Sequence, residues 1–298
     1  MSTPRVLSIQ SHVVRGYVGN KSATFPLQVL GFEVDAINSV QLCNHTGYAH
    51  FAGQVLQSSD FDTLVNGLAT NGLTHEYTHI LTGYVGSESF LQSVCRTVKE
   101  LKESNPDLTF VCDPVMGDNG KFYVPETLLP IYRDQLIQYA DVITPNQFEA
   151  ELLTGVTITT KDDALRAISV LHSRGCKVVI ITSSNLSGKD DSLLLLGSTK
   201  GGDKIEMTIP LLPATFVGTG DLFTALTMAW LHRGEALPSA CQKTLSTMQT
   251  ILSRTLAHAR EQSHGSEPSA AQLELRLIQS KDVIESPPPG SCQPTVLS

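Results

Sequence analysis

Short apolar runs alternate with longer helical patterns through most of this chain. Runs rich in Val, Ile and Leu stand at residues 6–9, 34–37, 80–82, 108–111, 142–143 and 178–182. Most of these runs are continuous rather than alternating between apolar and polar positions, which is typical of strands covered on both faces. We therefore expect a buried sheet in which most strands run parallel.

Helical stretches separate these runs, for example at residues 89–103 and 161–173. One face of the second stretch carries apolar residues at helical spacing, namely Ala164, Leu165, Ile168 and Leu171. Strands that alternate with helices predict a parallel sheet with helices on both sides. The predicted fold class is therefore α/β, with three layers in the order helix, sheet and helix.

The pattern changes towards the carboxyl end. Residues 192–196 and 205–209 are apolar runs separated by residues that include Gly and Lys, and they predict an added hairpin. After Val217 the pattern is nearly all helical as far as Leu273. The sequence shows no internal repeat and no linker in its middle, so it predicts one domain.

The last residues differ in composition from the rest. Residues 285–290 read Glu-Ser-Pro-Pro-Pro-Gly, which is too rich in Pro for a packed element. We therefore expect the domain to cover residues 1–282 and to be followed by a disordered, Pro-rich tail over residues 283–298.

The composition is that of an ordinary globular protein. Of 298 residues, 41% are hydrophobic and 17% are charged, which suffices for a large core without disulfides or metals. The formal net charge is −8, and no run of Lys and Arg offsets it. Such a field repels nucleic acid and anionic membranes, so we expect neither as a partner. A nucleotide stays possible where amides and a cation offset its phosphates.

The six cysteines form no C-x-x-C pair. The amino terminus has no apolar signal segment, and no apolar run is long enough to span a bilayer. Reduced thiols in the cytoplasm are the simplest interpretation, so we expect a cytoplasmic protein.

The segment with the clearest chemistry is Gly218-Thr219-Gly220-Asp221, which leads into a helical pattern. Two glycines at alternate positions allow a tight turn that exposes successive N–H groups, and at a helix N-terminus these groups form an anion site. Asp221 stands beside that site, where its carboxylate would take a proton from an attacking hydroxyl. From spacing alone, a tight turn with a capping Asp fits equally well.

This segment resembles the anion-hole and base motif of the ribokinase-like superfamily, and the match to pyridoxal kinases extends over nearly the whole chain. The other segments that carry the resemblance are residues 8–20, 44–48, 81–84, 112–118, 143–151, 179–184 and 272–276. The resemblance implies a ribokinase-like three-layer α/β/α kinase domain with a central, mostly parallel sheet. It also implies ATP-dependent phosphorylation of the 5′-hydroxymethyl group of pyridoxal, pyridoxine and pyridoxamine in vitamin B6 salvage.

The resemblance gives roles to individual residues. Asp221 would be the base, and Gly218, Thr219 and Gly220 would hold the transferred phosphoryl group. The residues expected around the vitamer are Ser11, Val18, His45, Thr46, Tyr84 and Asp221. Those expected at ATP are Asp113, Asp118, Tyr123, Asn146, Thr182, Ser183, Leu212, Pro213, Ala214 and Thr219.

The resemblance also implies two cations. Asp118 would face Mg²⁺ or another divalent ion. The residues expected near a monovalent ion, K⁺ or Na⁺, are Asp113, Thr144, Glu149 and Thr182. The residues themselves agree, because Asp113 and Thr144 each follow a predicted strand and ligands of open α/β sheets gather at the carboxyl ends of strands.

Purely structural interpretations of these residues stay open. Thr144-Pro145-Asn146-Gln147 also fits a helix start with Thr144 as the N-cap and Pro145 as the first helical residue. Asp113 precedes Pro114, which favours extended backbone at Asp113 and would fit a simple turn.

One competing motif is His75-Glu76-Tyr77-Thr78-His79, which matches the H-E-x-x-H pattern of zinc proteases. That chemistry needs both histidines on one helical face, whereas the residues from Tyr77 onwards have a strand pattern and Asn71-Gly72 breaks a helix before them. We therefore expect no zinc site here.

Two other functions stay open at this point. The chain would also fit a kinase for another heterocyclic alcohol, such as hydroxymethylpyrimidine, or a non-catalytic vitamer-binding protein that kept the fold. The resemblance further implies a homodimer, which no feature of the sequence demonstrates by itself.

Overall fold

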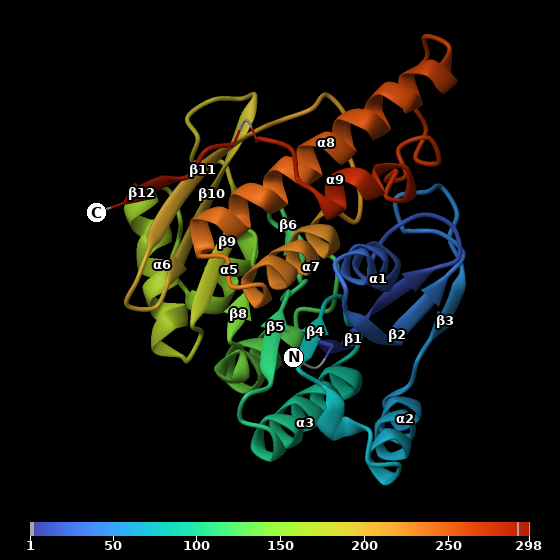
Figure 1. The fold of residues 1–298 in the computed structure, drawn as a ribbon, viewed down its shortest axis with the longest axis vertical. Helices are drawn as coiled ribbons and strands as arrows, with labels where there is room; N and C mark the ends of the chain where they lie inside the picture. The colour runs from blue at the N-terminus through green and yellow to red at the C-terminus, as the bar shows by residue number, and fades with distance from the viewer. Residues whose placement is uncertain (1–2, 291, 298) are drawn as a thin grey trace.

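The computed structural model describes residues 3–290 and 292–297, and a central sheet runs through them (Figure 1). The parallel strands of this sheet are β1 (Arg5–Val13), β2 (Glu33–Leu42), β4 (His79–Thr82), β5 (Thr109–Cys112), β8 (Val142–Ile143) and β9 (Val178–Ser184). The antiparallel strands at its two edges are β3 (Gly53–Val55), β10 (Ser192–Thr199), β11 (Lys204–Pro210) and β12 (Thr295–Leu297). Within the described residues, the order is β12-β11-β10-β9-β8-β5-β4-β1-β2-β3.

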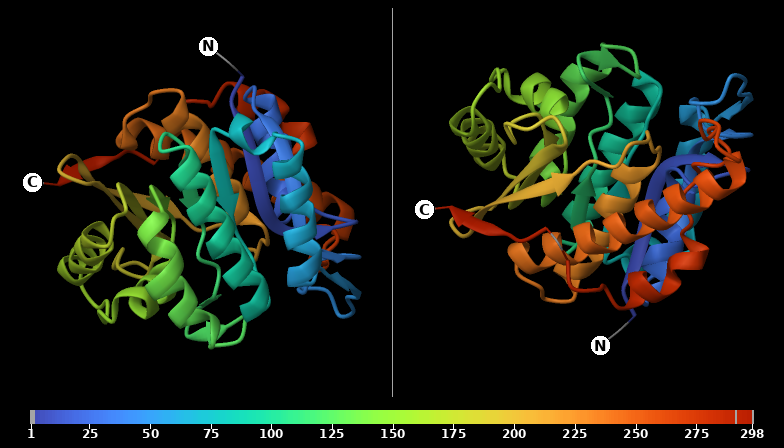
Figure 2. Two further views of the ribbon diagram at one scale, coloured as in Figure 1. Left: turned by 90° about the horizontal axis from the view of Figure 1, so that it is seen from below. Right: turned by 90° about the horizontal axis from the view of Figure 1, so that it is seen from above.

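Helices cover both faces of the sheet, as Figure 2 shows from two sides. One face carries α2 (Ser58–Thr70), α3 (Glu88–Ser104), α4 (Leu128–Ile131), α5 (Gln147–Thr154) and α6 (Lys161–Ser173). The other face carries α1 (Asn20–Val29), α7 (Thr219–His232), α8 (Leu237–Ser263) and α9 (Lys281–Glu285). Shorter turns are η1 (Thr74–Glu76), η2 (Tyr132–Leu136), η3 (Ile137–Tyr139) and η4 (Ile278–Ser280), and β6 (Gly117–Asp118) pairs with β7 (Lys121–Phe122).

Alternate side chains of the parallel strands enter the two cores. In β1, Leu7 and Ile9 pack with the helices on one face, whereas Val6 packs with those on the other. All three side chains are at most 1% exposed. Because both faces need apolar side chains, these strands have continuous apolar runs in the sequence. The predicted three-layer α/β/α architecture is confirmed.

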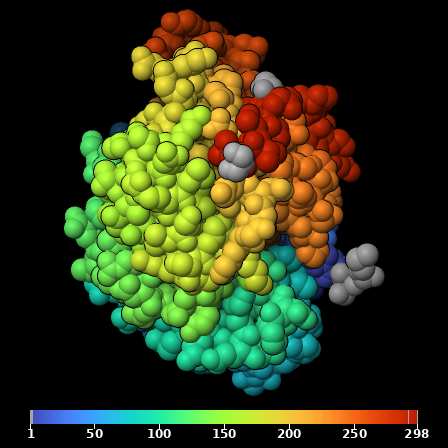
Figure 3. Space-filling view, turned by 90° about the vertical axis from the view of Figure 1, so that its left-hand side faces the viewer, coloured from blue at the N-terminus to red at the C-terminus, as the bar shows by residue number. Residues whose placement is uncertain are grey.

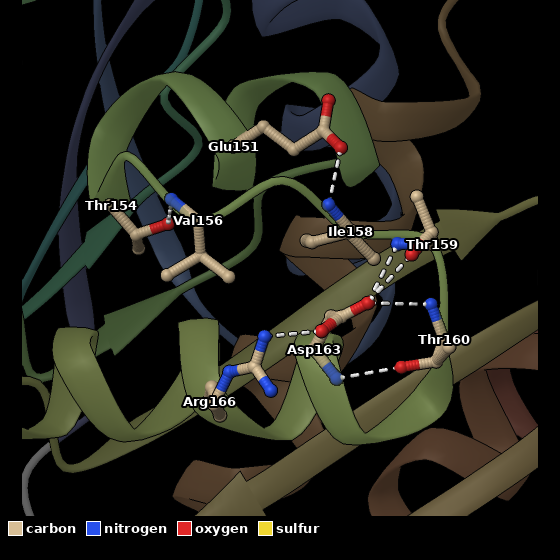
Figure 4. Close-up of polar contacts among 8 residues, drawn as sticks. All are labelled: Glu151, Thr154, Val156, Ile158, Thr159, Thr160, Asp163 and Arg166. Atoms are coloured by element: carbon tan, nitrogen blue, oxygen red, sulfur yellow. Dashed lines mark hydrogen bonds and ion pairs between the residues drawn. The ribbon is translucent and has the colours of Figure 1, made fainter.

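Local hydrogen bonds fix the start of α6 next to the end of α5 (Figure 4). The Thr160 hydroxyl accepts a hydrogen bond from Asp163 N at 3.2 Å, and the Asp163 carboxylate accepts one from Thr160 N at 2.9 Å. This reciprocal capping box satisfies N–H groups that the first turn leaves free. Hydrogen bonds from the Thr159 hydroxyl and N–H help to lower the pKa of Asp163 to about 2. The helix therefore begins where the sequence pattern predicted.

The prediction of a disordered tail from residue 283 is wrong for the described part of that segment. Val283 and Ile284 lie in α9 with 6% and 0% exposure, and Ser246 donates a hydrogen bond to the carbonyl of Pro288 at 2.5 Å. Residues 295–297 then pair with β11 as strand β12. Figure 3 shows this segment lying against the hairpin and α8. A Pro-rich stretch still offers carbonyl acceptors, and the open edge of β11 provides pairing partners.

The helical pattern also stops earlier than predicted. Helix α8 ends at Ser263, and His264 follows with φ of 49°, in the left-handed region that closes helices. Leu273 lies in an irregular connection that leads to η4 at Ile278. The strands of the central sheet come from segments between Arg5 and Leu297, so we propose that the described chain forms a single domain.

The buried part of the tail predicts a measurable loss of stability. Ile284→Ala should lower the free energy of unfolding by about 2–5 kcal/mol, because it deletes a fully buried side chain. Ile278→Ala is the matched control, since Ile278 is 49% exposed, and its effect should stay within about 0.5 kcal/mol. Urea unfolding measures both values. Equal and small effects of the two variants would contradict the packing of α9.

Candidate active site

The predicted site residues gather at the carboxyl ends of the parallel strands. Ser11 lies near the end of β1, Tyr84 follows β4 and Asp113 follows β5. Thr144 follows β8, and Thr182 lies in the last part of β9. Since parallel strands end at one edge of the sheet, residues far apart in the sequence come together there.

Asp221 lies in the first turn of α7, and its carboxylate faces the turn after β1. Asp221 Oδ2 accepts a hydrogen bond from Gly19 N at 2.7 Å. A Cβ atom on Gly19 would lie 2.4 Å from Ser11 Oγ, so the Ser11 hydroxyl stands against the same backbone position. The carboxylate bonds to this neighbouring loop rather than to an N–H of its own helix. The capping interpretation of Asp221 therefore lacks the hydrogen bond that it requires.

The turn before α7 requires glycine at its first position. Gly218 is the N-cap of α7 with φ of 83°, and a Cβ atom there would lie 2.2 Å from the carbonyl oxygen of Tyr17 and 3.2 Å from Val18 Cγ1. The first-turn N–H groups of α7, from Thr219 onwards, lack intrahelical partners and suit an anion. A Cβ atom on Gly220 would lie 3.6 Å from Asp113 Oδ2, so Asp113 lies close to this anion site.

Buried carboxyl groups concentrate negative charge around the turn. Burial raises the pKa of Asp113 well above its usual value, and the nearby charges of Glu149 and Asp221 raise it further. Burial also raises the pKa of Asp221 and lifts that of Glu149 to about 7. Within the described residues, no Lys, Arg or His forms an ion pair with Asp113, Asp118, Glu149 or Asp221. The site therefore has the electrostatics that a cation would relieve.

The start of α5 differs from the alternative with Thr144 as its cap. Asn146 is the N-cap, with its side chain accepting from Glu149 N at 2.9 Å, and Glu149 Oε2 accepts from Asn146 N at 3.0 Å. Thr144 is buried and shares a hydrogen bond of 2.9 Å with the hydroxyl of Thr224 in α7. The cap interpretation of Thr144 is wrong because the helix begins two residues later. Thr144 instead joins β8 to the helix that carries Asp221.

Glu149 and Asn146 also hold the loop that carries Asp118. Glu149 Oε1 accepts a hydrogen bond from Met116 N at 2.8 Å, and Asn146 Nδ2 donates to the Gly117 carbonyl at 2.7 Å. Asp118 follows directly in β6. These two residues therefore have a structural role beside the ligand roles predicted for them.

The predicted vitamer residues lie on several loops. His45 is buried, and its Nδ1 accepts a hydrogen bond from Gly47 N at 3.1 Å. A Cβ atom on Gly47 would lie 3.7 Å from Val217 Cγ2, which places this loop beside the turn before α7. Tyr84 is half-buried, and burial raises its pKa. Thr46 is exposed and makes no hydrogen bond to the rest of the described chain, so its predicted contact stays untested.

The predicted ATP residues come from several elements. Thr182 N donates to the Pro145 carbonyl at 2.9 Å, and Ser183 follows it, half-buried. Tyr123 lies just after the β6–β7 hairpin and is 60% exposed. Residues 212–214 lie between β11 and α7, and within the described chain no hydrogen bond joins them to the other predicted ATP residues. Their place at the adenine stays a prediction.

The H-E-x-x-H residues lie on different elements. His75 is exposed in η1, whereas His79 is buried in β4, where its Nδ1 shares a 2.7 Å hydrogen bond with Thr78 Oγ1. Burial lowers the pKa of His79 to about 4. In residues 3–290 and 292–297, no group of three or more His, Cys, Asp or Glu side chains is placed to hold a metal ion.

The structure adds residues that sequence reasoning missed. Gly19 and Glu274 both lie in segments that carried the family resemblance, but neither had a role assigned to it. Thr224 had no signal in the sequence beyond its place three residues after Asp221, on the same side of a helix.

The comparisons with known proteins identify the family of this chain. The model of the family described as "Phosphomethylpyrimidine kinase" matches residues 62–268. The pyridoxal kinase of Bos taurus is 54% identical over 95% of this chain and 96% of its own length. The chain belongs to the pyridoxal kinase family. The pyridoxal kinase of Arabidopsis thaliana is 49% identical over 96% of this chain and 92% of its own length.

Solved pyridoxal kinase structures have the same fold. The structure of pyridoxal kinase from Leishmania donovani in complex with ADP and pyridoxine is 35% identical, with a TM-score of 0.90 and 99% of both chains covered. A complex of the same protein with ADP and pyridoxamine gives the same values. The predicted family and ribokinase-like fold are therefore confirmed.

The raised pKa of Glu149 predicts a pH-dependent stability. The folded protein keeps a proton at pH values where the unfolded chain, with the ordinary value of 4.5, has lost it. This contribution is present below pH 4.5 and disappears as the pH rises through about 7. In metal-free protein, Glu149→Gln should therefore reduce the fall in unfolding free energy between about pH 5 and about pH 8.

Urea unfolding of the wild type and of this variant measures the difference. The lowered pKa of His79 makes the unfolding free energy rise with pH in part of this range. This contribution is the same in both proteins and cancels when their pH dependences are compared. Glu126→Gln, at an exposed position, should leave the wild-type pH dependence unchanged. An equal pH dependence in wild type and Glu149→Gln would contradict the prediction.

Proposed function

We propose that this protein transfers the γ-phosphoryl group of ATP to the 5′-hydroxymethyl group of pyridoxal, and also of pyridoxine and pyridoxamine. The products are ADP and the vitamer 5′-phosphate, as in vitamin B6 salvage. Support comes from the pyridoxal kinases that are 52–54% identical to it and from the relatives solved with ADP and a vitamer.

One observation carries the proposal within this chain. The Asp221 carboxylate and the Ser11 hydroxyl both lie against Gly19, and Asp113 lies close to Gly220 in the turn before Asp221. A base, a polar contact for the acceptor alcohol and an anion site therefore share one place. These are the parts that phosphoryl transfer to an alcohol needs.

The chemistry follows from this placement. Asp221 accepts the proton of the 5′-hydroxyl group while the oxygen of that hydroxyl forms a bond to the γ-phosphorus of ATP. The bond from this phosphorus to the oxygen that bridges it to the β-phosphate breaks and releases ADP. Burial raises the pKa of Asp221 towards neutral pH, and a base is most effective when its pKa lies near the working pH. N–H groups at the start of α7 stabilise the phosphoryl oxygens as they pass.

The buried carboxyl cluster fits the cations implied by the family. Asp118 would face Mg²⁺ or another divalent ion together with phosphate oxygens, because Mg²⁺ binds through one or two carboxylates plus substrate phosphates. Asp113, Thr144, Glu149 and Thr182 would surround K⁺ or Na⁺. Such ions would offset charge on the phosphates and on the carboxyl groups.

Three further expectations remain proposals for this chain. We propose that Asn146, Thr182, Ser183 and Tyr123 contact ATP, with residues 212–214 near the adenine. We also propose a homodimer and a cytoplasmic location. As to membranes, no helix in the described ranges is long and apolar enough to cross one.

A second candidate substrate has a specific basis. The matching family model is described by phosphomethylpyrimidine kinase, so another heterocyclic alcohol such as hydroxymethylpyrimidine deserves a direct comparison. The third hypothesis, a non-catalytic vitamer-binding protein, conflicts with the intact base and anion site described above.

The test is an absorbance assay for pyridoxal 5′-phosphate with pyridoxal, ATP, Mg²⁺ and K⁺, repeated with hydroxymethylpyrimidine as acceptor by measuring ADP. We expect the larger kcat/KM for pyridoxal. A larger kcat/KM for hydroxymethylpyrimidine would favour the second candidate. Vitamer binding without any product would favour the binding protein.

A further inference from the structure

The carboxylate of Glu274 joins the connection between α8 and η4 to two loops that carry predicted vitamer residues. Glu274 lies between α8 and η4, and its side chain is only 12% exposed. Its Oε2 accepts a hydrogen bond from Tyr17 N at 3.0 Å, and its Oε1 accepts one from the Tyr48 hydroxyl at 2.9 Å. The same Oε1 lies 3.5 Å from His45 Nε2. Glu274 therefore has partners on the β1–α1 loop and on the β2–β3 loop.

The β1–α1 loop has a glycine, Gly16, where it contacts the Glu274 carboxylate. Gly16 has φ of 94°, and a Cβ atom there would lie 2.1 Å from Glu274 Oε1. A side chain at this position would push the carboxylate out and would also strain the backbone. The carboxylate of Glu274 can therefore approach this loop closely only because residue 16 is a glycine.

Both loops continue directly to the predicted vitamer contacts. Tyr17 precedes Val18, and its carbonyl lies against Gly218 of the anion site. His45 and Tyr48 flank Gly47, which lies beside Val217. The two rings also pack edge to face, with centroids 4.8 Å apart. A change at Glu274 would therefore reach the loops around the vitamer directly, whereas Glu274 forms no hydrogen bond or ion pair with the described residues predicted for ATP.

Building on the proposed function, we propose that Glu274 is a positioning residue that holds these two loops in the arrangement that binds the vitamer. Its negative charge matters because each oxygen accepts hydrogen bonds from a different loop and a carboxylate has no competing donor. It acts through His45, Tyr48 and Tyr17 and does not itself take part in phosphoryl transfer.

The test is Glu274→Gln, which keeps the shape but turns one acceptor into a donor that opposes Tyr17 N–H or the Tyr48 hydroxyl. We expect KM for pyridoxal to rise by about tenfold or more, the size of a lost hydrogen bond to a charged group. We expect KM for ATP to stay within about twofold, since Glu274 forms no hydrogen bond or ion pair with the described residues predicted for ATP. Glu267→Gln, at an exposed position of the same connection, should match the wild type.

A second variant links the effect to the loop. Tyr48→Phe removes the hydroxyl that Glu274 accepts, and it should raise KM for pyridoxal by a smaller factor. Because the two residues share one hydrogen bond, the double variant should show less than the product of the two single effects. Strictly multiplicative effects would contradict action through Tyr48.

A measurement without substrate separates this inference from the proposed function. Amide exchange of residues 44–52 in the ligand-free protein should become faster in Glu274→Gln, while exchange around α5 should not change. If the wild type forms no pyridoxal phosphate, the proposed function fails and this exchange alone decides the role of Glu274. Unchanged exchange, or an equal rise in KM for pyridoxal and ATP, would overturn the inference.

Discussion

Asp221→Asn should lower kcat for pyridoxal phosphorylation by about a hundredfold or more, the usual contribution of a general base. The variant keeps an oxygen that accepts the Gly19 N–H bond, which measures 2.7 Å in the wild type. The loop after β1 should therefore stay in place, and KM for pyridoxal and for ATP should change little. A loss in kcat at nearly constant KM indicates an interaction made in the transition state.

Steady-state kinetics with the absorbance assay check this expectation. Asp162→Asn, at an exposed position in the first turn of α6, is the matched control and should have wild-type kinetics. Retention of more than about a tenth of the wild-type kcat by Asp221→Asn would mean that another group takes the proton. The assignment of the base would then be wrong, although the kinase activity would stand.

Gly218→Ala should lower kcat by about a hundredfold or more, as expected for a displaced anion-site donor. The added methyl group would lie 2.2 Å from the Tyr17 carbonyl oxygen, so either the turn or the loop after β1 must move. Each movement displaces the N–H groups at the start of α7 relative to Asp221 and Asp113. The free energy of unfolding should also fall, because φ of 83° is unfavourable for Ala.

The control separates backbone strain from the collision. Gly234 has nearly the same φ, 84°, but nothing lies within 4 Å of its added Cβ. Gly234→Ala should therefore have a similar strain cost, about 1 kcal/mol, with wild-type kcat. Kinetics and urea unfolding of both variants distinguish the two causes. Equal kcat values for the two variants would contradict a role of the turn in phosphoryl transfer.

The sequence pattern predicted most strands of the fold, but one strand depends on packing against another part of the chain. The apolar runs at 6–9, 34–37 and 178–182 are strands in the structure, since burial on both faces demands continuous apolar sequence. The pattern gave no sign of β12, because residues 295–297 are exposed or half-buried and pair only with the free edge of β11. Edge pairing depends on a partner elsewhere in the chain and not on the composition of the segment itself.

In the site, too, some features could be predicted from the sequence and others could not. Asp221 and the glycines before it were recognisable, because a tight turn into a helix restricts residue types at fixed spacing. The alternative with Thr144 as the cap of α5 was wrong, since Thr and Asn both occur as caps and only the actual helix start, after Asn146, decides between them.

The sequence by itself determined the α/β class and the family, and it predicted the base and the anion-site turn, because these follow from local patterns and ordered motifs. Only the tertiary structure decided that the charges of Glu149 and Asp221 raise the pKa of Asp113 and that Glu274 reaches the loops at Tyr17 and Tyr48. The physical reason is that burial and charge interactions depend on distances between residues far apart in the chain. Such distances exist only once the sheet has brought the strand ends together.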